Sequence, residues 1–490
     1  MVPVSQEPFH AGDATVSSPF GRMAQAQPAR RAMQSLAQSG VTAVALTFVD
    51  NAGITRVKTA PLARFEAVAQ QGLGMSPVFD VFLVDDSITS SPHVGGPTGD
   101  LRLLPDVEQL VALAGQPGWA WAPADRFTHD GAEHAVCQRS FARRMVRDAR
   151  AAGVEFRMGY EIEWAVGRGD ADGDEFVPAC EGPAYGMTRV VELSDYSRDV
   201  LEALARQGVV VDQFHPEYAG AQFELSVAPA DPVTAADLNV LARQTIRAVG
   251  LRHGLRVSFA PAVVAGAVGN GGHLHLSAWA DGRNLLGGAG LPDAHGPRGP
   301  RGPRGPHGLS ERGESLLSGL LAAMPALCAV GAPSVASYLR LVPSRWAGCY
   351  QCWGRENREA ALRLITGPAG GEGSAANAEL KCFDLAANPY LVVGAVIAVA
   401  LDTLDAGLRL PGEMLGDPAA LGDAELAGRG VRRLPTSLPD AADALENSKV
   451  LRQAMGDPLF LAFLAVRRAE AELFAGQEPA QVVAATRWRY

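Results

Sequence analysis

Four segments of the sequence carry charged or imidazole side chains at every second position, within runs that otherwise resemble buried strands. In GYEIEWAV, Glu161 and Glu163 alternate with Ile162 and Trp164. A period of two places both carboxylates on one face of a strand, about 6.5–7 Å apart. The same alternation predicts polar faces in three further segments, which carry Glu217, Gln222, Glu224 and Ser226; His273, His275 and Ser277; and Glu379 and Lys381.

Separate solvated faces would explain each segment alone. They do not explain the four together, because large domains rarely leave four strands of one sheet open to water. If the polar faces converge, two carboxylates about 6.5 Å apart repel by roughly 2.5 kcal/mol at an effective dielectric near 20. A fold stabilised by only ~5–15 kcal/mol then needs cations among them. Oxygen ligands with one imidazole favour Mg²⁺ or Mn²⁺ over zinc, so the sequence predicts a site for these ions.

A group of arginines lies in the apolar-rich stretch LRLVPSRWAGCYQCWGRENREAALRL. Guanidinium groups suit the oxygens of carboxylates and phosphates. The sequence contains neither a Walker P-loop nor a dinucleotide-binding glycine motif, so metals and arginines would have to hold a bound nucleotide. Pairing with surface acids is the alternative explanation. The arginines are Arg340, Arg355, Arg358 and Arg363.

The composition is that of a large folded protein. The chain has 490 residues, of which 47% are hydrophobic, and this excludes disorder for the chain as a whole. A formal net charge of −10 argues against a nucleic-acid partner. Six scattered cysteines indicate a reducing compartment rather than a disulfide scaffold. The first residues do not resemble a secretory signal, so we expect a cytoplasmic location.

Sequence patterns divide the chain into a small and a large domain. Residues 1–27 lack periodicity and are predicted to form a mobile tail. A small domain is expected over 28–130 and a larger one over 131–490, with a flexible Gly-Pro-Arg insertion at about 288–312. Prolines and serines interrupt the uncharged stretch 316–339, which predicts a buried helix and no membrane partner. Strand candidates in the small domain are VTAVALTFVD, ITRVKTAP, FDVFLVD, DLRLLPD and GWAWAPAD.

With these motifs in hand, the chain resembles the glutamine synthetase family from about residue 40 to its end, outside the insertion. The resemblance implies an α+β fold, with a small β-grasp N-terminal domain and a large catalytic domain whose curved antiparallel sheet is flanked by helices. It also implies a homo-oligomer of two stacked rings, usually a dodecamer, with active sites between neighbouring subunits. The motifs that carry it are VDNAGITRVKTAP, GYEIEW, HPEYAGAQFE, GNGGHLH, RLVP followed by NREAALR, and ELKCFDLAANPYL.

The resemblance implies ATP and two or three Mg²⁺ or Mn²⁺ ions as cofactors. By motif position, one set of side chains would hold the first ion and another set the second ion, which lies against the nucleotide phosphates. The first set is Glu163, Glu217 and Glu224, and the second is Glu161, His273 and Glu379.

The other site residues follow from the same motifs. His275 matches a histidine near the nucleotide, Arg358 and Arg363 match phosphate-facing arginines, and Arg355 is predicted to join them. The remaining matches concern glutamate and the amine. Arg340 matches an arginine that binds the substrate carboxylate, and Gly269 lies in the loop that meets the amino acid. Asp50 matches an aspartate that enters the adjacent subunit's site and helps to deprotonate the amine.

The implied reaction phosphorylates the γ-carboxylate of glutamate with ATP, and an amine then displaces phosphate. Two departures concern the substrates. Trp346 stands where ammonia-using members carry a glutamate, and an indole cannot take a proton but can form the wall of a pocket for a larger amine. Lys381 replaces a usual arginine, so a bidentate contact becomes a point charge. The chain therefore resembles the branch that ligates glutamate to polyamines, ethanolamine or other small primary amines.

Three alternatives stay open at this point. The chain could be an ordinary glutamine synthetase that uses ammonia, a non-catalytic ring-forming relative, or a two-metal hydrolase that acts without ATP. The filled set of metal positions argues against a non-catalytic relative. The arginine group argues against a hydrolase, because hydrolysis does not need a phosphate-binding set.

Overall fold

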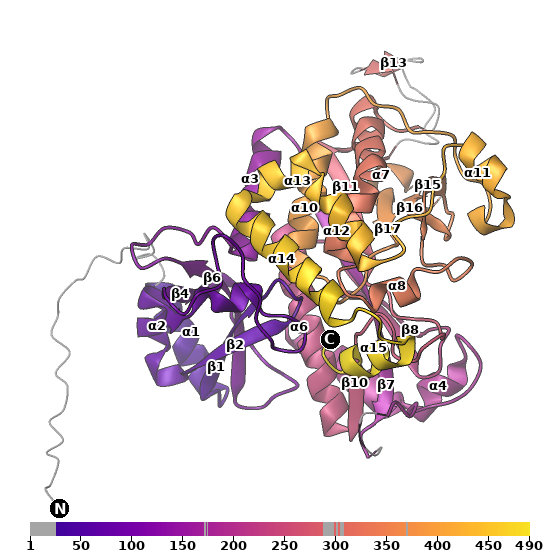
Figure 1. Ribbon diagram of the computed structural model, residues 1–490. Coiled ribbons are helices and arrows are strands. Elements are labelled where there is room, and N and C mark those ends of the chain that lie inside the picture. Colours follow the sequence, from indigo (N-terminus) through magenta and orange to yellow (C-terminus); the bar gives the residue numbers. More distant parts are fainter. Residues whose placement is uncertain are drawn as a thin grey trace, which may run out of the picture.

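The computed structural model describes residues 26–170, 173, 175–287, 298–299, 302–303, 308–368 and 371–490. Residues 1–25 of the predicted mobile tail and most of the predicted Gly-Pro-Arg insertion lie outside these residues, whereas residues 26 and 27 begin a helix. The described chain forms a small sheet domain beside a larger domain in which helices cover a second sheet (Figure 1). This architecture confirms the predicted α+β class.

The small domain is a six-stranded sheet with the order β2-β1-β6-β4-β3 and β5 paired to β6. β1 and β6 run parallel, and the other pairs are antiparallel. Helices α1 (Ala26–Gln38) and α2 (Phe65–Gln71) contribute to its core, in which Phe65 and Leu103 are fully buried. The strands are β1 (Ala43–Val49), β2 (Thr55–Pro61), β3 (Leu73–Met75), β4 (Leu101–Pro105), β5 (Val111–Ala112) and β6 (Trp119–Phe127).

The prediction of a strand at FDVFLVD is wrong. This segment begins with the 3-10 helix η3 (Pro77–Val81), which starts at a proline. The hydroxyl of Ser76 caps it by accepting a hydrogen bond from the amide of Val78. Proline fixes φ at a value suited to the first turn, and the cap satisfies an amide that would otherwise lack a partner. Local turn chemistry therefore outweighs the apolar alternation.

The large domain is built on a nine-stranded sheet with the order β15-β16-β17-β11-β7-β9-β8, with β10 on β7 and β12 on β11. Its pairs are antiparallel except β15 with β16, which run parallel. The strands of this sheet are β7 (Glu155–Arg168), β8 (Val211–Pro216), β9 (Gln222–Val227), β10 (Leu255–Ser258), β11 (Leu274–Ala280), β12 (Arg283–Asn284), β15 (Tyr350–Arg355), β16 (Ala360–Ile365) and β17 (Asn377–Leu380). A separate two-stranded pair joins β13 (Arg298–Gly299) to β14 (Gly302–Pro303).

Strand register brings the predicted polar faces together. β7 pairs with β9 on one side, where Glu163 lies opposite Glu224, and with β11 on the other. β17 pairs with β11 and β16, so that Glu379 lies opposite both His275 and Arg363. The alternate residues are fully buried on the other face, as the two-residue period predicted; they include Ile162, Trp164, Phe223, Leu225 and Leu274.

Helices cover the apolar face of this sheet. α10 (Pro389–Thr403) contacts α3 (Gln138–Ala151), α6 (Pro232–Arg252) and α7 (Glu311–Gly331). α7 is long and apolar enough to cross a membrane by length and composition, but 78% of its apolar window is buried inside the fold. This supports the predicted buried helix. The remaining helices are α4 (Met187–Glu192), α5 (Ser194–Arg206), α8 (Ser337–Arg340), α9 (Glu372–Ala375), α11 (Asp423–Gly428), α12 (Leu438–Glu446), α13 (Lys449–Met455), α14 (Asp457–Leu473) and α15 (Pro479–Thr486).

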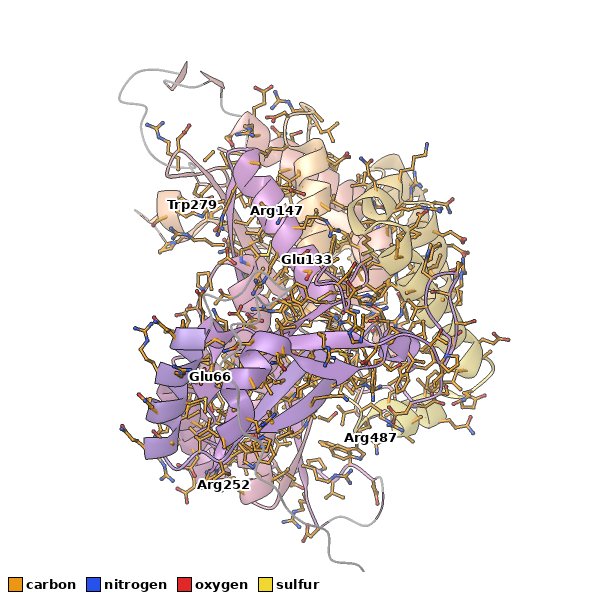
Figure 2. The ribbon with its side chains drawn as sticks, turned by 90° about the vertical axis from the view of Figure 1, so that its left-hand side faces the viewer. Glu66, Glu133, Arg147, Arg252, Trp279 and Arg487 are labelled. Atoms are coloured by element: carbon orange, nitrogen blue, oxygen red, sulfur yellow. The ribbon has the colours of Figure 1, made fainter. Side chains whose placement is uncertain are left out.

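α14 connects the two domains. It contacts α12 and α13 of the large domain and η3 of the small one. The Arg467 guanidinium on this helix donates to the carbonyl oxygens of Pro333 and Asn51, which lie in the large and small domains. In the view turned by 90°, Trp279 of β11 lies well above Glu66 of α2, so the sheets of the two domains occupy different parts of the molecule (Figure 2).

Candidate active site

A cavity of about 1250 Å³ opens on the polar face of the large sheet. Strands β7, β8, β9, β11 and β16 line it, together with the loop that follows α8. Most of the predicted site residues therefore meet in one place. Those that line the cavity are Glu161, Glu163, Glu217, Glu224, Gly269, His273, His275, Arg340, Trp346, Arg358, Arg363 and Lys381.

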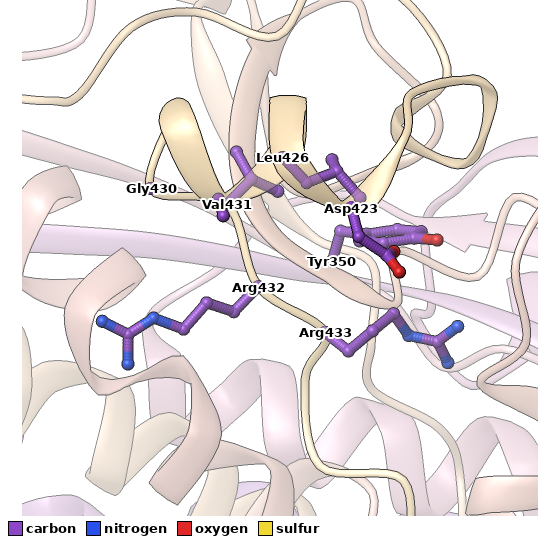
Figure 3. A pocket seen from close by; sticks show the side chains of 8 residues that line it. Tyr350, Asp423, Leu426, Gly430, Val431, Arg432 and Arg433 are labelled. Carbon is purple, nitrogen blue, oxygen red and sulfur yellow. The ribbon is translucent and has the colours of Figure 1, made fainter.

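Another hollow, of about 690 Å³, lies beside α11. Its arginines, Arg432 and Arg433, point in opposite directions (Figure 3). The Arg433 guanidinium lies over the ring of Tyr350, 5.0 Å from its centre. These groups do not converge on a common point, so the candidate chemistry belongs to the larger cavity.

His215, Glu217 and Glu224 form one potential metal cluster, with one ligand atom from each within 4.8 Å of the others. The Nδ1 and Nε2 atoms of His215 are both 3.4 Å from a carboxylate oxygen, on Glu217 and Glu224 respectively. The hydrogen bond to Glu224 raises the pKa of His215 to about 9. His215 is therefore an additional imidazole beside Glu217 and Glu224, two of the acids that were predicted to hold the first ion.

Glu163 lies beside this cluster and is 8% exposed. Its Oε2 accepts hydrogen bonds from Gln222 Nε2 at 2.9 Å and from the amide of Gly271 at 2.8 Å. Burial, together with the neighbouring Glu224, raises the pKa of Glu163 above its usual range. Burial also raises the pKa of Glu224. Ionisation of both acids is therefore costly in this position unless a cation compensates their charge.

A second potential metal cluster consists of Glu161, His275 and Glu379. His275 Nε2 lies 3.1 Å from Glu161 Oε1, without the alignment of a hydrogen bond. The Nδ1 atom of His273 is 2.9 Å from Glu161 Oε2 and 3.2 Å from Glu379 Oε1. Both imidazoles therefore reach carboxylates of the predicted second set, although only His273 was assigned to it.

These residues fit the predicted hard divalent cations. Carboxylate oxygens dominate both clusters, and each cluster adds one imidazole nitrogen, a donor set that suits Mg²⁺ or Mn²⁺. Burial opposes ionisation of Glu161, yet its hydrogen bond with His273 and the adjacent His275 imidazole hold its pKa well below the usual range. The second cluster thus already stabilises a carboxylate anion, and the buried acids of the first cluster require positive charge.

Arg340 ends α8 and lies between the second cluster and the glycine loop after residue 268. Its Nη2 contacts His273 Nε2 at 2.9 Å and donates to the Lys381 carbonyl oxygen at 3.1 Å. Its Nη1 is buried without a hydrogen-bond partner among the described residues. A Cβ atom on Gly269 would lie 2.0 Å from the carbonyl oxygen of Pro261, so only glycine allows this close approach. Arg340 therefore keeps one donor free for a substrate oxygen.

Arg363 and Lys381 both point at Glu379. Arg363 Nη1 lies 3.0 Å from Glu379 Oε2, and Lys381 Nζ lies 3.0 Å from Glu379 Oε1. Lys381 is 3% exposed, so its ammonium acts inside the site rather than at its mouth. Arg358 is exposed in the cavity wall, where phosphate oxygens could reach it.

Arg355 is the exception among the predicted arginines. Its side chain is 45% exposed and lies outside the cavity lining. Its Nε donates to Glu413 Oε1 at 3.0 Å, and the same carboxylate accepts the Arg355 amide. The structure therefore does not bring Arg355 into the cavity with Arg358 and Arg363, and its guanidinium is paired with Glu413 instead.

Asp50 lies in the small domain, outside the cavity of its own chain, and is fully buried. Its carboxylate accepts hydrogen bonds from the amides of Ala52 and Ile54, and Oδ2 lies 2.7 Å from Arg56 Nε. Burial raises the pKa of Asp50 to about 6, against the opposing effect of Arg56. Its predicted role in a neighbouring subunit stays a prediction, because in its own chain the carboxylate is enclosed and paired with Arg56.

Trp346 lines the cavity with a side chain that is half exposed. Sequence reasoning did not find two other polar residues of this wall, His215 and Tyr185. The Tyr185 hydroxyl donates to Glu217 Oε2 at 2.7 Å. His215 precedes Glu217 by two positions and could have been found from the strand period, whereas Tyr185 lies in a loop without periodicity.

Comparisons with known proteins agree with this geometry. The family model of the glutamine synthetase N-terminal domain matches residues 29–134, and that of the glutamine synthetase catalytic domain matches residues 135–483. The chain is 54% identical over 473 residues to the gamma-glutamylpolyamine synthetase of Streptomyces coelicolor, covering 96% of this chain and 98% of that protein. It is 29% identical over 451 residues to the glutamate–methylamine ligase of Methyloversatilis universalis, covering 90% and 94%.

Solved structures show the same similarity. A crystal structure of a novel glutamine synthase homolog superposes with a TM-score of 0.79 at 32% identity, covering 92% of this chain and 99% of that one. An ADP complex of GmaS superposes with a TM-score of 0.74 at 26% identity, covering 91% and 96%. With both domain models matched and a 54% identical relative aligned along nearly its whole length, this chain belongs to the glutamine synthetase family.

Proposed function

We propose that this protein is an ATP-dependent ligase that joins the γ-carboxylate of glutamate to an organic primary amine, with a polyamine as the preferred amine. The observation that carries the proposal is the cavity in which two carboxylate–imidazole clusters face Arg340 and Trp346. The 54% identical relative is a gamma-glutamylpolyamine synthetase, and a more distant relative is a glutamate–methylamine ligase. Both names describe the joining of glutamate to an organic amine.

The glutamate substrate is assigned to the end of the cavity beside Arg340. The free Nη1 of Arg340 can donate to the α-carboxylate, and the backbone around Gly269 can contact the amino acid because no side chain intervenes. The Nη2 contacts with His273 and with the Lys381 carbonyl oxygen place the guanidinium at this end of the cavity before glutamate binds.

The nucleotide phosphates are assigned to the region of Arg358 and Arg363. Arg363 Nε is buried without a partner among the described residues, and Arg358 is exposed in the cavity wall. Two or three Mg²⁺ or Mn²⁺ ions, when bound, neutralise the charge that develops during transfer of the γ-phosphoryl group to the glutamate carboxylate. Glu161, Glu217, Glu224 and Glu379 would hold them, together with the adjacent imidazoles. The arginines then stabilise the same phosphoryl oxygens from the protein side.

The amine is assigned to the space between Trp346, Tyr185 and Glu217. The Tyr185 hydroxyl donates to Glu217 of the metal cluster, so its ring lies at the boundary between that cluster and the amine space. Asp50 of a neighbouring copy would accept the amine proton, because burial brings its pKa to about 6, closer to neutral pH. The deprotonated amine then displaces phosphate from the γ-glutamyl phosphate.

This assignment includes a homo-oligomer, which we propose to be a dodecamer of two stacked rings. The support is membership of the glutamine synthetase family, whose members are typically oligomeric. A ring of head-to-tail contacts would place one copy's small domain against the next copy's cavity.

The test is ADP release in the presence of Mg²⁺, ATP and glutamate across a panel of amines. The panel contains a diamine, a longer polyamine, ethanolamine, methylamine and ammonia. We expect the diamine or the polyamine to give the highest kcat/KM, with a product whose mass equals glutamate plus amine minus water. A higher kcat/KM for ammonia than for every organic amine would identify an ordinary glutamine synthetase instead.

A further inference from the structure

The loop that carries Trp346 has a strained backbone. Ser344 and Trp346 have left-handed φ angles of 55° and 54°, and Gly348 follows at 64°. A left-handed conformation costs a residue with a side chain roughly 1–2 kcal/mol. Both Ser344 and Trp346 are exposed, so burial of their side chains does not compensate this cost. Specific contacts must hold the loop in this shape.

Two carboxylates provide such contacts. Glu359 Oε1 accepts the amide hydrogen of Trp346 at 2.9 Å, and Asp417 Oδ2 accepts the hydroxyl hydrogen of Ser344 at 2.9 Å. Glu359 is itself fixed, because its amide donates to Asn357 Oδ1 at 3.0 Å. The Asn357 amide group donates in turn to the Met414 carbonyl oxygen at 2.7 Å, close to Asp417 in the chain. The two anchors therefore belong to one connected framework.

Glu359 is an unusual choice for a purely structural contact. It is 6% exposed, and its Oε2 is buried without a hydrogen-bond partner among the described residues. Burial raises the pKa of Glu359, which shows that the ionised side chain is costly at this position. A neutral acceptor would satisfy the same amide at a lower desolvation cost. The Glu359 side-chain oxygen nevertheless holds the Trp346 amide at 2.9 Å, so the contact itself is what this buried residue contributes.

We propose that Glu359 is a positioning residue for amine selection. It holds the backbone of Trp346 so that the indole forms the cavity wall against which the carbon chain of an organic amine packs. Glu359 is absent from the cavity lining given by the described residues, so it acts through Trp346 rather than on the substrate. This inference rests on the proposed function, because it concerns the amine acceptor of that reaction.

Two substitutions separate this role from a general effect on folding. Glu359→Gln retains an oxygen that can accept the Trp346 amide hydrogen, whereas Glu359→Ala removes it. In Glu359→Ala we expect KM for the organic amine to rise about tenfold, the effect of losing about 1.4 kcal/mol. KM for ATP, KM for glutamate and kcat/KM for ammonia should each change by less than about twofold, because binding of these substrates does not use the indole. Glu359→Gln should restore most of the amine affinity.

Trypsin cleavage after Arg345 measures the loop without reference to catalysis. We expect Glu359→Ala to be cleaved several-fold faster at Arg345 than the unsubstituted protein or Glu359→Gln. Cleavage at Arg429, whose side chain is 49% exposed directly after the end of α11, should be equal in all three and is the control. Ser344→Ala removes the second anchor without touching a buried carboxylate. It should show the same pattern more weakly, and it replaces Glu359→Ala if that variant does not fold.

The outcomes separate the two proposals. Unchanged amine KM and unchanged cleavage at Arg345 in Glu359→Ala would refute the positioning role. An equal loss in Glu359→Gln and Glu359→Ala would also refute it, because the amide contact would then not be the cause. If the unsubstituted protein ligates no amine, the proposed function is wrong. Faster cleavage at Arg345 in Glu359→Ala would then still support the contact by which Glu359 holds the loop.

Discussion

The guanidinium of Arg340 donates a hydrogen bond to the imidazole of His273, with Nη2 2.9 Å from Nε2. A guanidinium can only donate, so Nε2 carries the lone pair and the imidazole proton lies on Nδ1, facing Glu161 Oε2 at 2.9 Å. Burial, with a contribution from Lys381, lowers the pKa of His273 to about 4, and the ring is neutral at working pH. To offer Nδ1 to a cation, His273 must move this proton to Nε2 and lose its contact with Arg340.

Glutamate and divalent cations should therefore bind cooperatively. When Arg340 turns toward the α-carboxylate of glutamate, His273 Nε2 becomes free to take the proton, and the Nδ1 lone pair faces Glu161 and Glu379. We expect saturating glutamate to raise the affinity for Mn²⁺ about fivefold or more, a usual size for coupling between sites. Calorimetry with and without glutamate measures it. The same Mn²⁺ affinity in both conditions would contradict this coupling.

Glu161 should be essential for Mn²⁺ binding, because its two oxygens contact both His273 and His275. We expect Glu161→Gln to weaken Mn²⁺ binding at least about tenfold, since even partners that only orient metal ligands contribute this much. The measurement is the free Mn²⁺ signal in electron paramagnetic resonance. Glu133→Gln, at an exposed position outside the cavity lining, is the matched control and should bind as the unsubstituted protein does.

Arg340→Lys should damage glutamate binding selectively. Lysine keeps the positive charge but offers a compact ammonium in place of the planar fork, so the contact of the free Nη1 is lost. Hydrogen bonds to charged groups contribute about 1.5–3 kcal/mol, which predicts a rise in KM for glutamate of about ten- to a hundredfold. Steady-state kinetics at saturating ATP and amine test it. An equal rise in KM for ATP would point to a general disturbance of the cavity.

Asp50 should act in the site of a neighbouring copy. Asp50→Asn and Glu161→Gln each disable one half of a shared site, so each variant alone should have little activity. Mixed rings are assembled from equal amounts of the two variants. Roughly a quarter of their sites should regain activity, namely those in which one copy supplies an intact Glu161 and its neighbour supplies an intact Asp50. Gel filtration followed by the ligase assay measures the recovery. No recovery in mixed rings would place Asp50 outside any shared site.

Glu470 should make stability depend on pH. It is 1% exposed, accepts the Val84 amide hydrogen at 2.9 Å and lies 3.0 Å from Arg467. Burial raises the pKa of Glu470 from 4.5 to about 7. Between these values the folded state keeps a proton that the unfolded state has lost, so this contribution to stability is complete below about pH 4.5 and falls as pH rises toward 7.

Glu470→Gln cannot ionise and should lose this dependence. Relative to the unsubstituted protein, its free energy of unfolding should increase by about 3 kcal/mol between pH 4.5 and pH 7. Thermal unfolding midpoints recorded across this range test the sign. Parallel curves for the two proteins would show that Glu470 does not bind its proton more tightly in the folded state.

The strand period in the sequence determined which side chains share a face. Glu161 and Glu163 had to lie opposite Ile162 and Trp164 wherever that strand paired, because the alternation is a local property of an extended backbone. The same alternation and the arginine-rich stretch marked the other metal-ligand candidates and the arginines, and the family motifs assigned roles to them. Only Arg355 among the predicted arginines lies outside the cavity lining.

Tertiary structure alone decided how these faces meet. Pairing of β7 with β9 and of β17 with β11 brings together residues far apart in the chain, and this register selects which imidazole approaches which carboxylate. The contact of Glu359 with the Trp346 amide depends on a loop with left-handed residues, which alternation cannot indicate. Side-chain periodicity follows from local geometry, whereas ligand distances and loop anchors arise only when distant segments are packed against one another.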